Sequence, residues 1–155
     1  MLVMTTKVDK RKLLIAAAAL LAAIAALIFL GGNESQPTAS MTAPATADTN
    51  DARVKFLTEL GWEVTASPAE ATEVRIPQSG DEVFARYNEL QKSQGYDLTK
   101  YAGKKVMRYV YKINNYPDAQ EPVYATLLVY KDRIIGGDIT DTTPGGRVQG
   151  FAASS

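Results

Sequence analysis

The hydrophobic and polar positions divide the chain into three stretches of different character. Residues 13–30 are 18 in number and carry no polar side chain, residues 33–50 show no periodicity, and the remainder alternates in short periodic runs. As a helix, such an apolar run rises about 27 Å, close to the roughly 30 Å of a bilayer core. The pattern therefore predicts a membrane-spanning helix, a linker and one folded domain.

Charges beside the apolar run predict its orientation in a membrane. Residues 1–12 contain four basic residues and one acidic residue, whereas no Lys or Arg follows the run before Arg53. Basic flanks stay in the cytoplasm. We therefore expect a cytoplasmic basic segment over 1–12 and a single-pass cell-membrane anchor that contacts the lipid bilayer from Leu13 to Leu30. A cleaved signal peptide is the alternative, but the run is longer than the usual apolar region of such peptides.

The residues after the anchor predict a linker and then a domain. Segment 31–50 is rich in Ser, Thr, Ala and Pro. Such a segment buries too little apolar surface to offset the entropy lost on ordering, so we expect it to be solvated. The soluble domain is predicted over 51–151, outside the cytoplasm, with a tail over 152–155.

Periodicity within the domain predicts two helices. One begins at Asp51 and ends at Leu60, where Gly61 is well placed to stop it. A second helix begins at Ser79, which forms a capping-box pattern with Glu82, and ends near Gly95.

Alternation of apolar and polar residues predicts the strands, which cover 62–66, 73–76, 104–114, 123–130 and 133–140. Lys131 and Asp132 would form a two-residue hairpin turn, and a loop is expected from Thr142 onward. The resulting order is α-β-β-α-β-β-β. We therefore expect an α+β fold, a small antiparallel sheet with both helices on one face.

Composition excludes several classes of function. The chain has 17 basic and 17 acidic residues and contains neither Cys nor His. A balanced charge does not suit a nucleic-acid binder. The missing residue types exclude disulfides, thiol nucleophiles, Ser-His-Asp triads and ordinary zinc sites. We therefore expect no nucleic-acid partner, no cofactor, no metal site and no enzymatic activity.

Strand tyrosines are the most suggestive binding candidates. Tyr109 and Tyr111 share one face of a predicted strand, and Tyr124 and Tyr130 share one face of the next. If the helices covered the other face, the four side chains would form one amphipathic patch suited to a protein, peptide or glycan. Tyr is also frequent in strands because it packs well there, so half-buried structural tyrosines are the alternative.

Gly136, Gly137 and Asp138 are further candidates, since they match the start of the diguanylate cyclase signature. The match is weak because Ile139 and Thr140 stand where an acidic and an aromatic residue are required. Two glycines within a strand more often indicate a bulge or a close backbone contact. In that interpretation Asp138 accepts hydrogen bonds from local amides.

Acidic residues raise two more hypotheses. Asp132, Asp138 and Asp141 could offer oxygen ligands to calcium, although their spacing is not that of a calcium-binding loop. A pair of carboxylates could cleave glycosides, although nothing in the sequence selects one pair.

Three segments of the domain resemble a known family. They are GYDLTKYAGKK at 95–105, NYP at 115–117 and ATLLVYKDRIIGGD at 125–138. They are similar to an uncharacterised domain of unknown function, which occurs in short bacterial proteins, mostly of Gram-positive anaerobes, that often carry one N-terminal membrane helix. The resemblance covers roughly residues 53–151 and implies no known activity, so it assigns no catalytic residue.

These features predict a membrane-anchored extracytoplasmic domain that serves as a binding or regulatory module of the bacterial cell envelope. Its partner would be another envelope protein or a peptide, bound by a sheet face or a strand edge. Two alternatives stay open: a carboxylate-dependent envelope hydrolase and a passive structural spacer.

Overall fold

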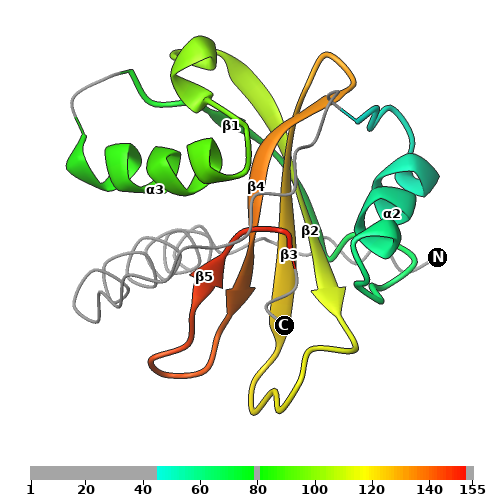
Figure 1. Ribbon diagram of the computed structural model, residues 1–155. Helices are drawn as coiled ribbons and strands as arrows, with labels where there is room; N and C mark the ends of the chain where they lie inside the picture. Colours follow the sequence, from blue (N-terminus) through cyan, green and yellow to red (C-terminus); the bar gives the residue numbers. More distant parts are fainter. Residues whose placement is uncertain (1–44, 79–80, 153–155) are drawn as a thin grey trace, which may run out of the picture.

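A computed structural model describes residues 45–78 and 81–152 of the chain (Figure 1). The predicted membrane anchor and residues 31–44 of the predicted linker lie outside the described residues. Within the described part, no helix is both long enough and apolar enough to span a bilayer.

The described residues form two α-helices, a short 3-10 helix and five strands. In chain order these are α2 Asn50–Glu59, β1 Glu70–Arg75, α3 Glu82–Ser93, η2 Leu98–Tyr101, β2 Lys105–Ile113, β3 Val123–Tyr130, β4 Arg133–Asp141 and β5 Val148–Gln149. All strands join one antiparallel sheet in the order β1-β2-β3-β4-β5. The predicted α+β class and antiparallel sheet are therefore confirmed.

The predicted element order is wrong in two places. Residues 62–66 form no strand, because Val64 makes only an isolated bridge to Ile113 while Trp62 is drawn into the core. The loop after β4 closes as a hairpin, in which the Asp141 amide donates to the Arg147 carbonyl at 2.9 Å, and this hairpin returns the chain as β5.

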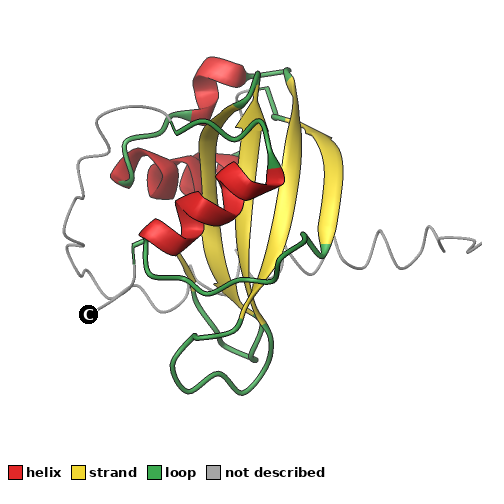
Figure 2. Ribbon diagram, turned by 90° about the vertical axis from the view of Figure 1, so that its right-hand side faces the viewer, coloured by secondary structure: helices red, strands yellow, loops and turns green. Residues whose placement is uncertain are grey.

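The helices lie on opposite faces of the sheet, so the prediction of one shared face is wrong. Successive strand residues point to opposite faces. Ile139 joins the core cluster of Leu57 from α2, whereas the adjacent Asp138 accepts a 2.7 Å hydrogen bond from Tyr87 of α3. Figures 1 and 2 show one helix on either side of the strands. The physical reason is that β3 has buried residues on both faces, so each face of the sheet must pack against a helix.

The larger core lies between α2 and the sheet. Phe56 and Leu57 of α2 pack there with Leu127 and other strand residues. Phe151, which is 2% exposed, closes this core from the C-terminal side. Its ring meets Phe56 edge-on at 5.3 Å, and its carbonyl accepts a 2.7 Å hydrogen bond from the indole of Trp62.

The smaller core, between α3 and the other face, depends on polar contacts as well as apolar ones. Leu98, Val106 and Leu128 belong to its apolar cluster. The Gln91 side chain of α3 is fully buried, and its Oε1 accepts a 2.8 Å hydrogen bond from the Gly137 amide. This contact fixes α3 directly to the backbone of β4.

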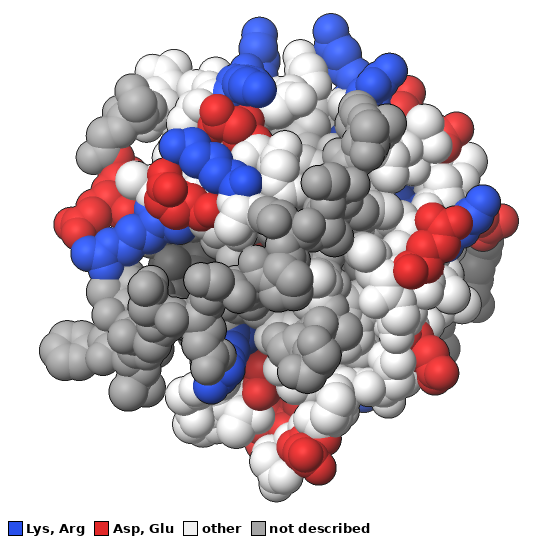
Figure 3. Space-filling model, viewed as in Figure 1, with Lys and Arg blue, Asp and Glu red and all other residues white. Residues whose placement is uncertain are grey.

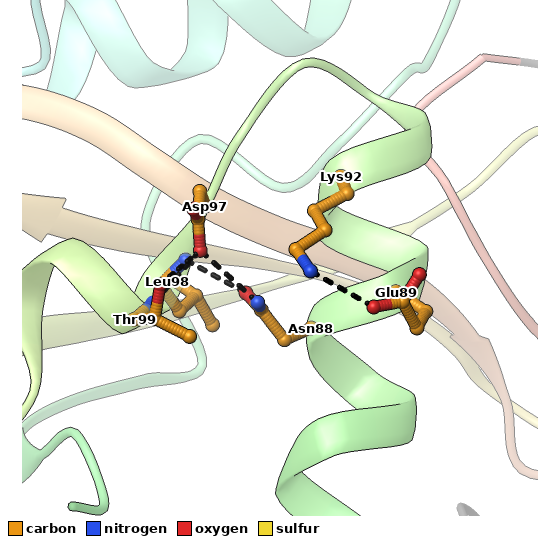
Figure 4. Close-up of polar contacts among 6 residues, drawn as sticks. All are labelled: Asn88, Glu89, Lys92, Asp97, Leu98 and Thr99. Atoms are coloured by element: carbon orange, nitrogen blue, oxygen red, sulfur yellow. Dashed lines mark hydrogen bonds and ion pairs between the residues drawn. The ribbon is translucent and has the colours of Figure 1, made fainter. Parts of the chain in front are cut away.

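A second polar cluster joins α3 to η2 (Figure 4). Asn88 Oδ1 accepts from the Leu98 amide at 2.7 Å, and Asn88 Nδ2 donates to Asp97 Oδ1 at 3.1 Å. The Thr99 hydroxyl donates to the same Asp97 oxygen at 2.6 Å. Hydrogen bonds from Thr99 and Asn88 lower the pKa of Asp97 to about 2. Asp97 is therefore a charged N-cap that Asn88 holds in place.

Replacing Asn88 by Asp should destabilise the domain at neutral pH, because two carboxylates would then face each other. Repulsion and burial raise the pKa of the new group, and an acid with a raised folded-state pKa binds its proton more tightly in the folded state. The free energy of unfolding should therefore fall as pH rises above about 4. Denaturant titrations of the full chain at several pH values measure this, with Asn114→Asp on an exposed loop as the control. Equal pH profiles for both variants would contradict it.

The folded domain begins before the predicted boundary at residue 51. Ala47 is 1% exposed, and its amide donates to the Asp132 carbonyl at 2.8 Å. The Ala45 carbonyl accepts from the Ile134 amide at 3.1 Å. The predicted linker is therefore too long by six residues, because backbone pairing with the β3–β4 turn orders 45–50.

The turn between β3 and β4 forms as predicted, whereas the N-cap of α3 differs from the prediction. Lys131 and Asp132 have φ of 46° and 62°, which confirms the hairpin turn. Thr49 caps α2 by accepting from the Ala52 amide at 3.1 Å. The predicted cap Ser79 lies outside the described residues, and Asp81 occupies the N-cap position of α3.

Candidate functional site

The four candidate tyrosines do not form one patch. In the register of β2 and β3, Tyr109 lies opposite Leu127. Tyr109 and Tyr111 therefore share the α2 face with Leu127, whereas Tyr124 and Tyr130 point to the α3 face. The single-patch interpretation is wrong, because it required all four tyrosines to lie on the same face of the sheet. A binding role for each tyrosine stays a prediction.

Tyr111 has a structural role that explains its complete burial. Its hydroxyl accepts from Arg53 Nε at 3.0 Å and donates to Asn50 Oδ1 at 2.9 Å. The Arg53 guanidinium also lies 3.8 Å from the ring centroid of Tyr109 and donates to the Ala47 carbonyl at 2.8 Å. These contacts dock α2 on the sheet.

Gly136 lies next to a bulge, and both Gly136 and Gly137 make close contacts, which agrees with the structural interpretation of this pair. The register of β3 and β4 shifts between Leu128 and Val129. A Cβ on Gly137 would lie 2.0 Å from the Thr126 carbonyl oxygen, and a Cβ on Gly136 would lie 2.8 Å from a side-chain oxygen of α3.

Asp138 is 3% exposed and accepts from hydroxyl groups instead of local amides, which corrects that part of the interpretation. Its donors are Tyr87 at 2.7 Å and Thr140 at 2.6 Å. Burial raises the pKa of Asp138, and the two hydrogen bonds oppose that rise.

The three candidate calcium ligands do not come together. Asp132 precedes β4 and Asp141 ends it, so these two residues lie at opposite ends of the strand. The described residues contain no group of three metal-ligating side chains.

A pocket of about 340 Å³ opens where the β2–β3 loop meets the β4–β5 loop. We call it the loop pocket. Its walls include Tyr116, Asp141, Thr143, Gly145, Arg147 and Gln149. It lies at the end of the sheet away from the β3–β4 turn (Figure 1).

The Tyr116 wall of the loop pocket is held rigidly. Its ring stacks on Trp62, with centroids 5.9 Å apart and planes inclined by 14°. Asn115 Nδ2 donates to the Gly61 carbonyl at 2.8 Å, and Asn115 Oδ1 accepts from the Glu63 amide at 2.9 Å. The aromatic surface is therefore fixed before any ligand arrives.

The opposite wall is a tight loop closed by its own backbone. The Thr143 amide donates to Asp141 Oδ1 at 2.9 Å, and the Gly146 amide donates to the Thr143 carbonyl at 2.6 Å. Gly145 has φ of +78°, a conformation that favours glycine. The loop thus presents backbone and short side chains to the pocket.

Two polar groups of the loop pocket lack partners in the described part of the chain. The Thr143 hydroxyl oxygen is buried without a hydrogen bond. The Arg147 guanidinium is exposed, and no ion pair joins it to Asp141, its neighbour across the hairpin. Burial raises the pKa of Tyr116, Asp141 adds to the rise and Arg147 opposes it. The pocket therefore offers hydrogen-bonding groups beside an aromatic ring.

A family model described as a domain of unknown function, DUF4830, matches residues 56–139. The chain belongs to the DUF4830 family. The resemblance predicted from the sequence is therefore confirmed, whereas the taxonomic and anchoring features of the family stay predictions. No curated protein and no solved structure matches the chain.

The DUF4830 match contains only part of the loop pocket. It runs from α2 to β4 and includes Tyr116, but it ends before Asp141 and Arg147. Sequence reasoning considered Asp141 only as a calcium ligand and did not single out Tyr116 or Arg147, because it treated both segments as ordinary loops. The available signal was the tight Pro144-Gly145-Gly146 turn between an acidic and a basic residue.

Proposed function

We propose that this DUF4830 chain is a membrane-tethered extracytoplasmic binding module, which captures a peptide segment of another envelope protein in the loop pocket. One observation carries the binding role: Thr143 and Arg147 have unpartnered polar groups beside the fixed ring of Tyr116. The apolar run over 13–30 and its basic flank support the tether and its orientation.

The walls of the loop pocket suit a peptide. The Arg147 guanidinium can donate two parallel hydrogen bonds to a carboxylate, or single ones to peptide carbonyls. The Tyr116 ring offers apolar surface and its hydroxyl a hydrogen bond. Because stacking on Trp62 already holds Tyr116, binding loses little side-chain entropy at this wall.

The size and charge of the loop pocket favour binding over hydrolysis. A volume of about 340 Å³ accommodates one or two side chains of a longer segment. Asp141 is the one carboxyl group among the residues that line this pocket, whereas glycoside cleavage requires a facing pair. A passive spacer would not account for unpartnered donors grouped in one pocket.

Arg147→Glu should reduce partner recovery at least about tenfold, because it replaces attraction for an acceptor by repulsion. The measurement is crosslinking in intact cells with tagged full-length protein, followed by quantitative mass spectrometry. Lys112→Glu makes the same charge change on an exposed residue of β2 that does not line the pocket, and should leave recovery unchanged. Equal recovery from wild type and both variants would exclude the loop pocket as the binding site.

A further inference from the structure

Basic residues gather at the sheet end that lies opposite the loop pocket. Arg75 of β1 pairs there with Lys105 of β2, and the β3–β4 turn adds Lys131 and Arg133. Figure 3 shows Lys and Arg side chains crowding the upper edge, where Figure 1 places η2 and this turn. We call this surface the basic end; its exposed residues are Arg75, Lys100, Lys104, Lys105, Lys131 and Arg133.

Acidic residues do not cancel this charge. Glu73 pairs with Lys105 at 2.8 Å, and Asp97 is occupied by hydrogen bonds from α3 and η2. Asp132 lies in the β3–β4 turn, and Asp48 follows Ala47, which pairs with that turn. Among the described residues, five of the cations form no ion pair: Arg75, Lys100, Lys104, Lys131 and Arg133. Arg75 donates to the Gly103 carbonyl at 2.8 Å, whereas the other four side chains form no hydrogen bond of this kind within the described part of the chain.

At the other end of the sheet, the β4–β5 loop contains both Asp141 and Arg147, and the β2–β3 loop is acidic. Loop 114–122 contains Asp118 and Glu121 but no Lys or Arg. Charge is therefore distributed unevenly along the strands, and an anionic surface would attract the basic end and repel this loop.

The chain enters the domain beside the basic end. Thr46 bridges to Arg133, and the Ala47 amide donates to the Asp132 carbonyl of the β3–β4 turn. The predicted anchor stops at Leu30, so segment 31–44 separates it from the domain. Fourteen residues span about 20 Å as a coil and at most about 50 Å when extended. A tether of this length would allow the basic end to reach the bilayer surface.

We propose that the basic end binds the anionic lipid surface of the membrane that holds the tether, which directs the loop pocket away from the bilayer. This proposal rests on the proposed tether. The tether makes the contact intramolecular, so that even a weak electrostatic attraction is populated. Anionic headgroups attract clustered Lys and Arg near the surface, and the attraction fades within a Debye length of about 8 Å at physiological salt.

Energy transfer from a label to the lipid surface tests this contact. The chain has no cysteine, so Ala102→Cys introduces a single exposed labelling position at the end of η2. Full-length protein is reconstituted into vesicles of phosphatidylcholine alone or with phosphatidylglycerol, each with a headgroup acceptor. Transfer should be about twofold higher in the anionic vesicles and should fall to the neutral level in high salt.

A charge-matched pair of variants shows whether the basic end is responsible. Neutralising Lys100, Lys104, Lys131 and Arg133 to Gln should abolish the difference between the two kinds of vesicle. The control neutralises the same number of exposed cations elsewhere, namely Lys55, Arg86, Lys92 and Lys112, and should retain the difference. Cooperative unfolding, followed by the fluorescence of Trp62, establishes that both variants are folded.

The outcomes separate this proposal from the proposed function. Flotation with neutral vesicles after an alkaline wash tests the tether alone, and its loss would overturn both. Retained flotation with equal transfer in neutral and anionic vesicles would overturn the basic-end contact and leave the tether intact. A difference that persists in the Lys100, Lys104, Lys131 and Arg133 variant would assign the contact to another surface.

Discussion

Replacing Gly137 by Ala is expected to lower the free energy of unfolding by about 3 kcal/mol. The added Cβ would lie 2.0 Å from the Thr126 carbonyl oxygen and 2.5 Å from the Phe151 ring. The first atom belongs to the backbone of β3, so the clash can be relieved only by moving strands apart. Denaturant unfolding of the full chain, followed by Trp62 fluorescence, measures the loss.

Gly61→Ala is the matched control for this variant. Gly61 has φ of +90°, so Ala is strained there, but no atom lies within 4 Å of the added Cβ. Its cost should therefore be about 1 kcal/mol, the backbone contribution alone. Equal losses for Gly137→Ala and Gly61→Ala would show that the close approach of β4 to β3 does not determine stability.

Replacing Phe151 by Ala is expected to cost about 4 kcal/mol, although the residue stands only four positions from the end of the sequence. Its ring is buried against Phe56 and also meets Tyr96 edge-on at 6.2 Å. Removing it would leave a cavity under α2 that these side chains cannot fill. The loss should appear as a lower midpoint of cooperative unfolding.

Phe84→Ala provides the comparison. Phe84 packs against the smaller core from a partly buried position on α3, so its removal leaves less unfilled space. We expect it to cost about half as much as Phe151→Ala. If Phe151→Ala costs no more than Phe84→Ala, the C-terminal segment does not close the larger core.

Local features of the fold could be predicted from the sequence. Gly61 adopts a positive φ directly after α2, and Lys131 with Asp132 forms the hairpin turn. In each case the residues that decide the conformation are neighbours in the chain. The alternation also located β3 correctly over 123–130, but the burial of both its faces was not predicted.

Long-range pairing could not be predicted in the same way. The register that puts Tyr109 opposite Leu127 depends on where loop 114–122 reverses the chain, and a shift of one residue would exchange the two faces. Ala47 illustrates the same limit, because its burial depends on the distant β3–β4 turn.

The loop pocket escaped prediction for a related reason. Tyr116 and Arg147 are 31 positions apart in sequence and meet only because β2, β3, β4 and β5 are consecutive neighbours in the sheet. No periodicity connects them. Asp138 was visible in the sequence, but its burial and its contact with Tyr87 followed only from the placement of α3.

Photocrosslinking from two positions tests the central claim most directly, namely that a tethered domain binds its partner at the end away from the membrane. A benzophenone amino acid replaces either Tyr116 in the loop pocket or Lys104 at the basic end, in full-length protein in intact cells. We predict one recurrent protein adduct from position 116, lost in the Arg147→Glu background, and no such adduct from position 104. The same protein adduct from position 104, with none from position 116, would contradict the account.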